Sequence, residues 1–158
     1  MAKQEKTNVM RFLEQKKIPY QMHDYIESGA IAGEDVARVL GENPDEVFKT
    51  LVTVGKSKQN YVFLVPVNKE LNLKKAASAV GEKSIEMIKS KDLLGLTGYV
   101  HGGCSPIGMK KQFPTVVHNT ADTMENILFS GGKIGMQVEI KTEDFKKIIN
   151  LKFADIAE

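Results

Sequence analysis

The chain has 158 residues, of which 42% are hydrophobic and 27% charged, with a net charge of +2. These proportions are typical of one globular domain, and the charge is too small for a protein that holds nucleic acid by charge alone. The single cysteine, Cys104, excludes an internal disulfide and a cysteine-built metal site, and three dispersed histidines argue against zinc, so no cofactor or metal is expected.

Targeting signals are not evident. The first six residues are polar and lack an apolar signal core, and no apolar run reaches roughly 18 residues. We therefore expect a soluble, cytoplasmic protein that does not enter the membrane.

The N-terminal part predicts a helix followed by a short strand. Thr7 is a capping residue, and apolar side chains recur at helical spacing from there to Lys17, before a proline. Residues Tyr20–Tyr25 alternate as in a strand, one face of which carries His23 and Tyr25. That face is either an ordinary half-exposed pair or part of a site.

A loop over Glu27–Gly33 and a helix over Glu34–Leu40 follow, and Gly41 ends the helix. Asn43-Pro44-Asp45-Glu46 has the residue order of a helix start, but it leaves room for one turn only.

Next comes the stretch Val47–Val54, whose β-branched and aromatic residues favour a buried strand. Lys49 lies inside it, and a buried ammonium is costly without an anion or another polar partner. Because Lys49 sits where a short helix meets a strand, we expect it at the mouth of a pocket. The alternative is a lysine whose head group simply reaches solvent from the strand end.

The middle of the chain mixes strands and helices. Tyr61–Val67 is apolar and predicts a hairpin with the preceding strand, and Asn72 caps a helix over Leu73–Val80. Ser84–Ile88 predicts a short strand. Ser90 is expected to cap a short helix through Leu94, which Gly95 ends. This order lacks a strict strand–helix–strand rhythm and favours an α+β domain.

Glycines and prolines are concentrated in Gly98–Gly108. Adjacent glycines at 102 and 103 allow positive φ angles and let a ligand approach the backbone, whose N–H groups can hold a carbonyl or an oxyanion. A tight turn between strands is the commoner use of such a sequence.

The last part predicts two hairpin strands and a helix. The strands are Ile127–Phe129 and Ile134–Ile140, joined by a tight turn over Ser130-Gly131-Gly132-Lys133. A strand over Thr115–Asn119 precedes them. A helix over Thr142–Ile149 follows, with Leu151–Ile156 packing back as a tail. No linker or repeat is apparent, so residues 1–158 are expected to form one domain.

A catalytic set is harder to find. The order of serine, histidine and acidic residues suggests no triad, and neither a P-loop nor a dinucleotide motif is present. Cys104 follows two glycines, but no neighbour in the sequence would lower its pKa, which argues against a nucleophile.

Three stretches together resemble the YbaK/EbsC family, within the superfamily of prolyl-tRNA synthetase editing domains. They are Phe48-Lys49-Thr50-Leu51, the glycine-rich segment Gly98–Gly108, and Ser130-Gly131-Gly132-Lys133. The resemblance implies an α+β fold with a mixed, largely antiparallel, barrel-like sheet flanked by helices. It also implies a trans-editing deacylase that releases cysteine from mischarged Cys-tRNA(Pro), with prolyl-tRNA synthetase as a partner; the oligomeric state stays open.

The same resemblance implies the site. Lys49 would line the pocket for the 3′-terminal aminoacyl-adenosine as the residue most tied to activity. Tyr25, Thr50, Gly102, Gly103 and Ser130 match other pocket positions. The family mechanism needs no enzyme nucleophile, because the cysteine thiol of the substrate attacks its own ester and leaves as a thiolactone.

Two departures from the family pattern concern the pocket border. Ala32 stands where an aromatic residue is usual, and His101 where a small apolar residue is common. Two alternatives therefore stay open: a water-based deacylase of another small aminoacyl-tRNA such as Ala-tRNA(Pro), with His101 as general base, and a non-catalytic module that binds tRNA or a synthetase.

Overall fold

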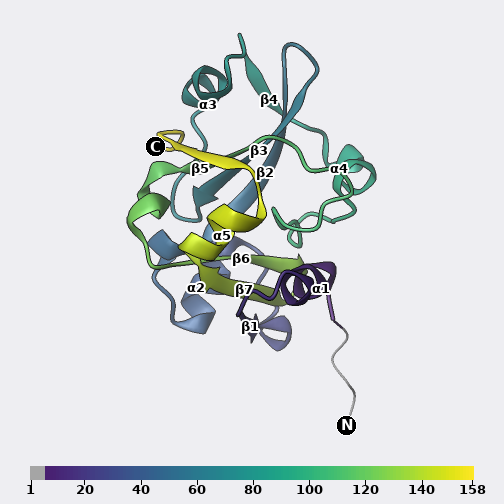
Figure 1. The fold of residues 1–158 in the computed structure, drawn as a ribbon, viewed down its shortest axis with the longest axis vertical. Coiled ribbons are helices and arrows are strands. Elements are labelled where there is room, and N and C mark those ends of the chain that lie inside the picture. The colour runs from purple at the N-terminus through teal and green to yellow at the C-terminus, as the bar shows by residue number, and fades with distance from the viewer. Residues whose placement is uncertain (1–5) are drawn as a thin grey trace.

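The computed structural model describes residues 6–158, which form two sheets (Figure 1). Strands β1 (Gln21–Asp24), β7 (Met136–Lys141) and β6 (Asn126–Lys133) form a three-stranded sheet in that order. The other sheet has five strands: β4 (Ile85–Met87), β2 (Phe48–Gly55), β3 (Asn60–Pro66), β5 (Thr115–His118) and β8 (Leu151–Ala154).

Strand directions are mixed, as expected for this α+β chain. The pairs β1–β7, β6–β7, β2–β3 and β2–β4 are antiparallel, whereas β3–β5 and β5–β8 are parallel. The predicted hairpin of β2 and β3 is confirmed, with Lys49 opposite Val65 and Thr50 opposite Leu64.

The two sheets meet beside the start of β2. A parallel bridge joins Val47 to Leu128 of β6, and the sheets do not close into one barrel. Phe48 and Val52 of β2 share one apolar cluster with Phe129 and Val138 of the smaller sheet. Burying one such side chain stabilises a fold by about 1.5–3 kcal/mol, so this cluster fixes how the sheets meet.

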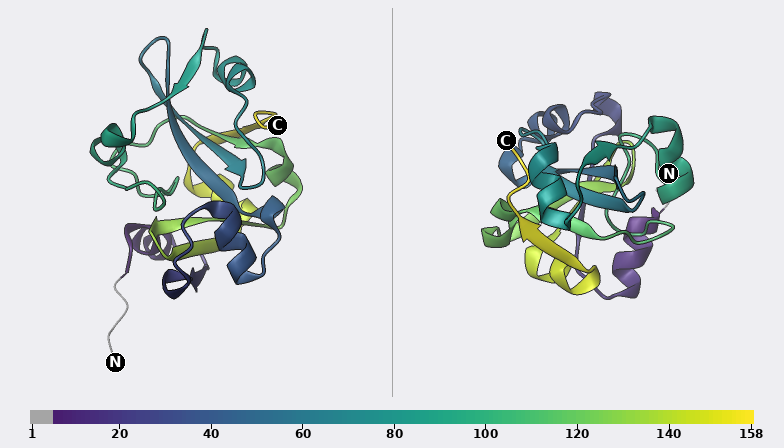
Figure 2. Two further views of the ribbon diagram at one scale, coloured as in Figure 1. Left: turned by 180° about the vertical axis from the view of Figure 1, so that it is seen from behind. Right: turned by 90° about the horizontal axis from the view of Figure 1, so that it is seen from above.

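The helices lie around the sheets, as the turned views in Figure 2 show. They are α1 (Asn8–Gln15), α2 (Gly33–Leu40), α3 (Leu73–Val80), α4 (Ser90–Thr97) and α5 (Thr142–Ile148), with single-turn helices η1 (Ile26–Ser28), η2 (Pro44–Glu46) and η3 (Asn119–Thr123). None of the helices in residues 6–158 is long and apolar enough to cross a membrane.

Several predicted caps are confirmed. The Thr7 hydroxyl accepts a hydrogen bond from the Met10 N–H at 3.2 Å, and Asn72 accepts one from the Lys75 N–H at 3.0 Å. Asn43 caps η2, which leads directly into β2. Lys49 therefore lies at the predicted junction between a helical turn and a strand.

The predicted cap, Ser90, and the predicted end of the fourth helix are both wrong. α4 runs through Gly95 to Thr97, begins after the cap residue Lys89 and ends at Gly98, whose φ of 85° is left-handed. A single glycine costs a helix only about 1 kcal/mol, which the burial of Leu93 and Thr97 offsets.

The predicted turn over Ser130–Lys133 is also wrong. These residues belong to β6, with a register shift between Ser130 and Lys133, and the turn lies at residues 134–135 instead, where Gly135 has a φ of 93°. Paired glycines mark an irregularity inside a strand as readily as a turn. Likewise, Leu151–Ala154 of the expected tail is a strand, β8, because it pairs with β5.

Candidate active site

A pocket of about 840 Å³ opens between the two sheets, where β2 runs beside β6. Its walls come from β2, from the residues around the start of α2, from the loop after α4, and from β6 and β7. Seven of the eight residues that the sequence assigned to the site or its border line it: Tyr25, Ala32, Lys49, Thr50, His101, Gly102 and Ser130.

Lys49 stands at the wall formed by β2, and its side chain is 27% exposed. The Nζ atom lies 3.5 Å from Oε1 of Glu70, which also lines the pocket. Within residues 6–158 this long contact is the one hydrogen bond or ion pair of the Lys49 ammonium. An ammonium carries three N–H donors, so Lys49 keeps donors for a ligand in the pocket.

Two buried polar atoms of pocket-lining residues have no hydrogen-bond partner in the described part of the chain. They are Oγ1 of Thr50 and Oε1 of Gln137. The Gln137 amide is oriented by Glu42, whose Oε1 accepts from Nε2 at 2.9 Å. Burial raises the pKa of the Glu42 carboxyl. Buried polar atoms are normally paired, so these two unpaired acceptors are an unusual feature of the pocket wall.

Tyr25 and Ala32 form the wall next to α2. Tyr25 is buried, and burial raises the pKa of its hydroxyl, so the hydroxyl stays protonated at neutral pH. Ala32 is the residue just before α2. Its single methyl group leaves space in the pocket that a larger side chain would fill.

Of the adjacent glycines, Gly102 lines the pocket and Gly103 does not. Gly102 has a φ of 86°, and a Cβ there would lie 2.9 Å from Ile31, so the position requires glycine. Gly103 packs against the backbone of Lys133 and Ile134 and donates its N–H to Val100. That N–H is therefore hydrogen-bonded within the loop and is not available to an oxyanion.

Ser130, His101 and Cys104 complete the far side. The Ser130 hydroxyl accepts from the Gly132 N–H at 3.2 Å, and His101 is exposed at the loop. Cys104 is 8% exposed, and burial raises the pKa of its thiol to about 12. A buried thiol that stays protonated is not a nucleophile, which agrees with the expectation from sequence.

Sequence reasoning missed Glu70 and Gln137. The sequence does contain a pattern that could have pointed to Gln137, since it is a polar residue within the mostly apolar run Ile134–Ile140. No local sequence pattern points to Glu70, because it lies between a strand and a helix and contacts Lys49 only through the tertiary fold.

Comparisons with known proteins agree with this geometry. The model of the aminoacyl-tRNA editing domain matches residues 28–148. The chain is 47% identical over 154 residues to the "Putative Cys-tRNA(Pro)/Cys-tRNA(Cys) deacylase EbsC" of Enterococcus faecalis, which covers 97% of this chain and 94% of that protein.

More distant relatives are larger or match in fold alone. A proline–tRNA ligase of Shouchella clausii is 28% identical over 65% of this chain and 18% of the ligase. The crystal structure of a "putative trans-editing enzyme for prolyl tRNA synthetase" superposes with a TM-score of 0.85 at 22% identity, over 96% of this chain and 95% of that one. The chain therefore belongs to the aminoacyl-tRNA editing domain family, in its YbaK/EbsC branch.

Proposed function

We propose that this protein is a trans-editing deacylase that releases cysteine from mischarged Cys-tRNA(Pro), and that residues 1–158 act as one editing domain. The observation that carries the proposal is the Lys49 ammonium, which faces a pocket at a strand entrance with one long contact to Glu70 among the described residues. The 47% identity to EbsC supports the choice of cysteine.

The chemistry requires little of the protein beyond orientation. The substrate thiol attacks its own ester carbonyl, so a C–S bond forms while the C–O bond to the ribose breaks. The proton of the thiol ends on the ribose hydroxyl, and cysteine leaves as a cyclic thiolactone. Lys49, Thr50 and Ser130 hold the aminoacyl end, and orientation alone is a large contribution to such intramolecular reactions. The protonated Cys104 takes no part.

A second candidate is a water-based deacylase of a small aminoacyl-tRNA such as Ala-tRNA(Pro). It is favoured by His101, an exposed imidazole on the pocket wall that can act as general base, and by the short side chain of Ala32. The third candidate, a non-catalytic module that holds tRNA or a synthetase, needs the same pocket but predicts no turnover.

We further propose that the protein acts in the cytoplasm, in an assisted complex with prolyl-tRNA synthetase. A net charge of +2 gives little long-range attraction for tRNA, so affinity for tRNA alone should be weak. Added synthetase should tighten tRNA binding. Tight binding that is indifferent to the synthetase would contradict this partnership.

The test is a panel of aminoacyl-tRNAs incubated with the wild type and with Lys49→Ala. Release of cysteine from Cys-tRNA(Pro), lost in the variant, supports the proposal. Faster turnover of Ala-tRNA(Pro) than of Cys-tRNA(Pro) favours the water-based reaction. Binding without turnover of any ester favours the non-catalytic module.

A further inference from the structure

The segment that carries Glu70 is paired with residues 155–158, here called the C-terminal clasp. The N–H of Glu70 donates to the carbonyl of Glu158, and the N–H of Glu158 donates to the carbonyl of Glu70, both at 3.0 Å. Next to this exchange, Leu71 and Ala157 form an antiparallel bridge, and the Asn72 N–H donates to the Ile156 carbonyl at 2.8 Å.

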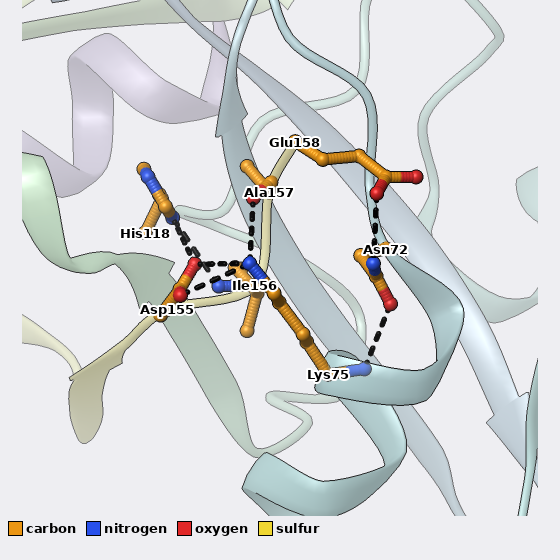
Figure 3. Close-up of polar contacts among 7 residues, drawn as sticks. All are labelled: Asn72, Lys75, His118, Asp155, Ile156, Ala157 and Glu158. Carbon is orange, nitrogen blue, oxygen red and sulfur yellow. Dashed lines mark hydrogen bonds and ion pairs between the residues drawn. The ribbon is translucent and has the colours of Figure 1, made fainter.

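Side chains from α3 and β5 hold the clasp in place. Figure 3 shows the Lys75 side chain reaching from α3 to the clasp, where Nζ lies 3.0 and 3.1 Å from the two Asp155 oxygens and 3.4 Å from the Ala157 carbonyl. His118 of β5 accepts the Ile156 N–H on Nδ1 at 3.2 Å. The Asn72 side chain donates to Glu158 at 3.0 Å while it caps α3.

These contacts hold the backbone of Glu70 in place. The Glu70 side chain is 83% exposed, and an exposed glutamate samples many rotamers at little cost. Its backbone, however, is fixed on both sides: by the clasp, and by the Val67 N–H, which donates to the Val47 carbonyl at 2.8 Å. The Glu70 carboxylate therefore lies at the pocket rim, beside the Lys49 ammonium.

We propose that Glu70 is a positioning residue for Lys49, and that the C-terminal clasp supports the active site by holding Glu70 at the rim. With one N–H of the ammonium directed to Glu70, the lysine stem is restrained and the remaining N–H donors point to the pocket. The activity consequence rests on the proposed deacylase function, whereas the structural coupling from the clasp through Glu70 to Lys49 does not.

The first test is a double-mutant cycle on Cys-tRNA(Pro) deacylation with Glu70→Gln and Lys75→Met. Each single change should lower kcat by about 1.5- to 5-fold, the range typical of exposed ion pairs. In the Glu70→Gln background, Lys75→Met should have no further effect, because both act through the same carboxylate. Glu125→Gln and Lys74→Met are matched controls, exposed positions where the same charge change should leave kcat unaltered.

Additive effects of the two changes would overturn the proposal, since Lys75 would then act on the RNA directly. A gain of activity in Glu70→Gln would overturn it as well, since Glu70 would then compete with the substrate for Lys49. Asp155→Asn breaks the same ion pair from the clasp side and should behave as Lys75→Met does, which guards against one poorly folded variant.

The second test needs no activity. In protein with ¹³C-labelled lysine, the Cε signal of Lys49 should shift in Glu70→Gln and in Lys75→Met, but not in Lys74→Met. Amide hydrogen exchange at Glu70 and Asn72 should accelerate in Lys75→Met. An unmoved Lys49 signal would refute the coupling, whereas a wild type inactive on every aminoacyl-tRNA would refute only the proposed function.

Discussion

Lys49 and Lys75 each lie within reach of a carboxylate, but their surroundings differ. Lys75 has three oxygen atoms within 3.4 Å, two from Asp155 and one from Ala157. Among residues 6–158, Lys49 has one oxygen partner, on Glu70, at 3.5 Å. The ammonium of Lys75 is saturated by the protein, so its role is to hold the clasp. The ammonium of Lys49 has one long contact at a pocket wall, so it keeps N–H donors that a ligand can accept.

The contrast predicts that Lys49→Ala removes activity and spares stability. Deleting a donor aimed at a reacting group typically costs about 10²- to 10³-fold in rate, so kcat/KM for deacylation should fall by at least about 100-fold. The midpoint of thermal unfolding should stay close to that of the wild type, as for most partly exposed substitutions. A variant that unfolds early would show that Lys49 is structural after all.

Lys75→Met should lower stability and largely spare activity. It leaves Asp155 without its cation and frees the carbonyl of Ala157, so the midpoint of thermal unfolding should drop by about 2 °C. The loss of activity should stay within the small range given above. Lys74→Met, one residue away, should leave the midpoint unchanged. A hundredfold loss of activity in Lys75→Met would erase the distinction between the two lysines.

The clasp should also weaken in mild acid. Burial lowers the pKa of His118 below its usual value, opposed by Asp155 and assisted by Lys69 and Lys75. Nδ1 accepts the Ile156 N–H, so the folded state needs this imidazole neutral. The stability contributed by neutral His118 is thus fully present above about pH 6.5 and is lost as the pH falls below it.

Chemical denaturation between pH 5 and 7 measures this effect. In His118→Asn the amide oxygen can replace Nδ1 as acceptor and does not titrate, so the pH dependence of the free energy of unfolding should be flatter than in the wild type. Equal slopes in the two proteins would contradict the assignment.

Cys104→Ala should have the smallest effect. The thiol of Cys104 lines the pocket but is buried and protonated. In the proposed reaction the reactive thiol belongs to the substrate. Deacylation should stay within roughly twofold of the wild type, since such a thiol is no nucleophile. A large loss of deacylation activity in a multiple-turnover assay would show that Cys104 takes part in the reaction.

Particular residues show how much of the site could be predicted from the sequence. Lys49 was predictable because a charged residue in a β-branched, apolar run conflicts with its surroundings, and Asn43-Pro44 placed it after a helical turn. Ser130 was predicted as a pocket residue by resemblance, although its turn was not, because paired glycines suit a turn and an irregular strand equally.

Other features had no local signal. Gly102 and Gly103 are alike in sequence, and only the packing of Gly103 against Lys133 and Ile134 separates them. The clasp joins residues 80 or more positions apart, Glu70 to Glu158 and Lys75 to Asp155. Neither segment has a local sequence pattern that predicts the other as its partner, since such pairings depend on the tertiary fold.

The central claim is that this pocket, through Lys49, releases cysteine from mischarged tRNA. Its most direct test is a single-turnover measurement of Cys-tRNA(Pro) with excess protein, alongside Lys49→Ala and the Lys74→Ala control. We predict rapid loss of the ester with the wild type and with Lys74→Ala, and a rate near the uncatalysed one with Lys49→Ala. If Cys-tRNA(Pro) survives at the uncatalysed rate with folded wild-type protein and prolyl-tRNA synthetase present, the claim is wrong.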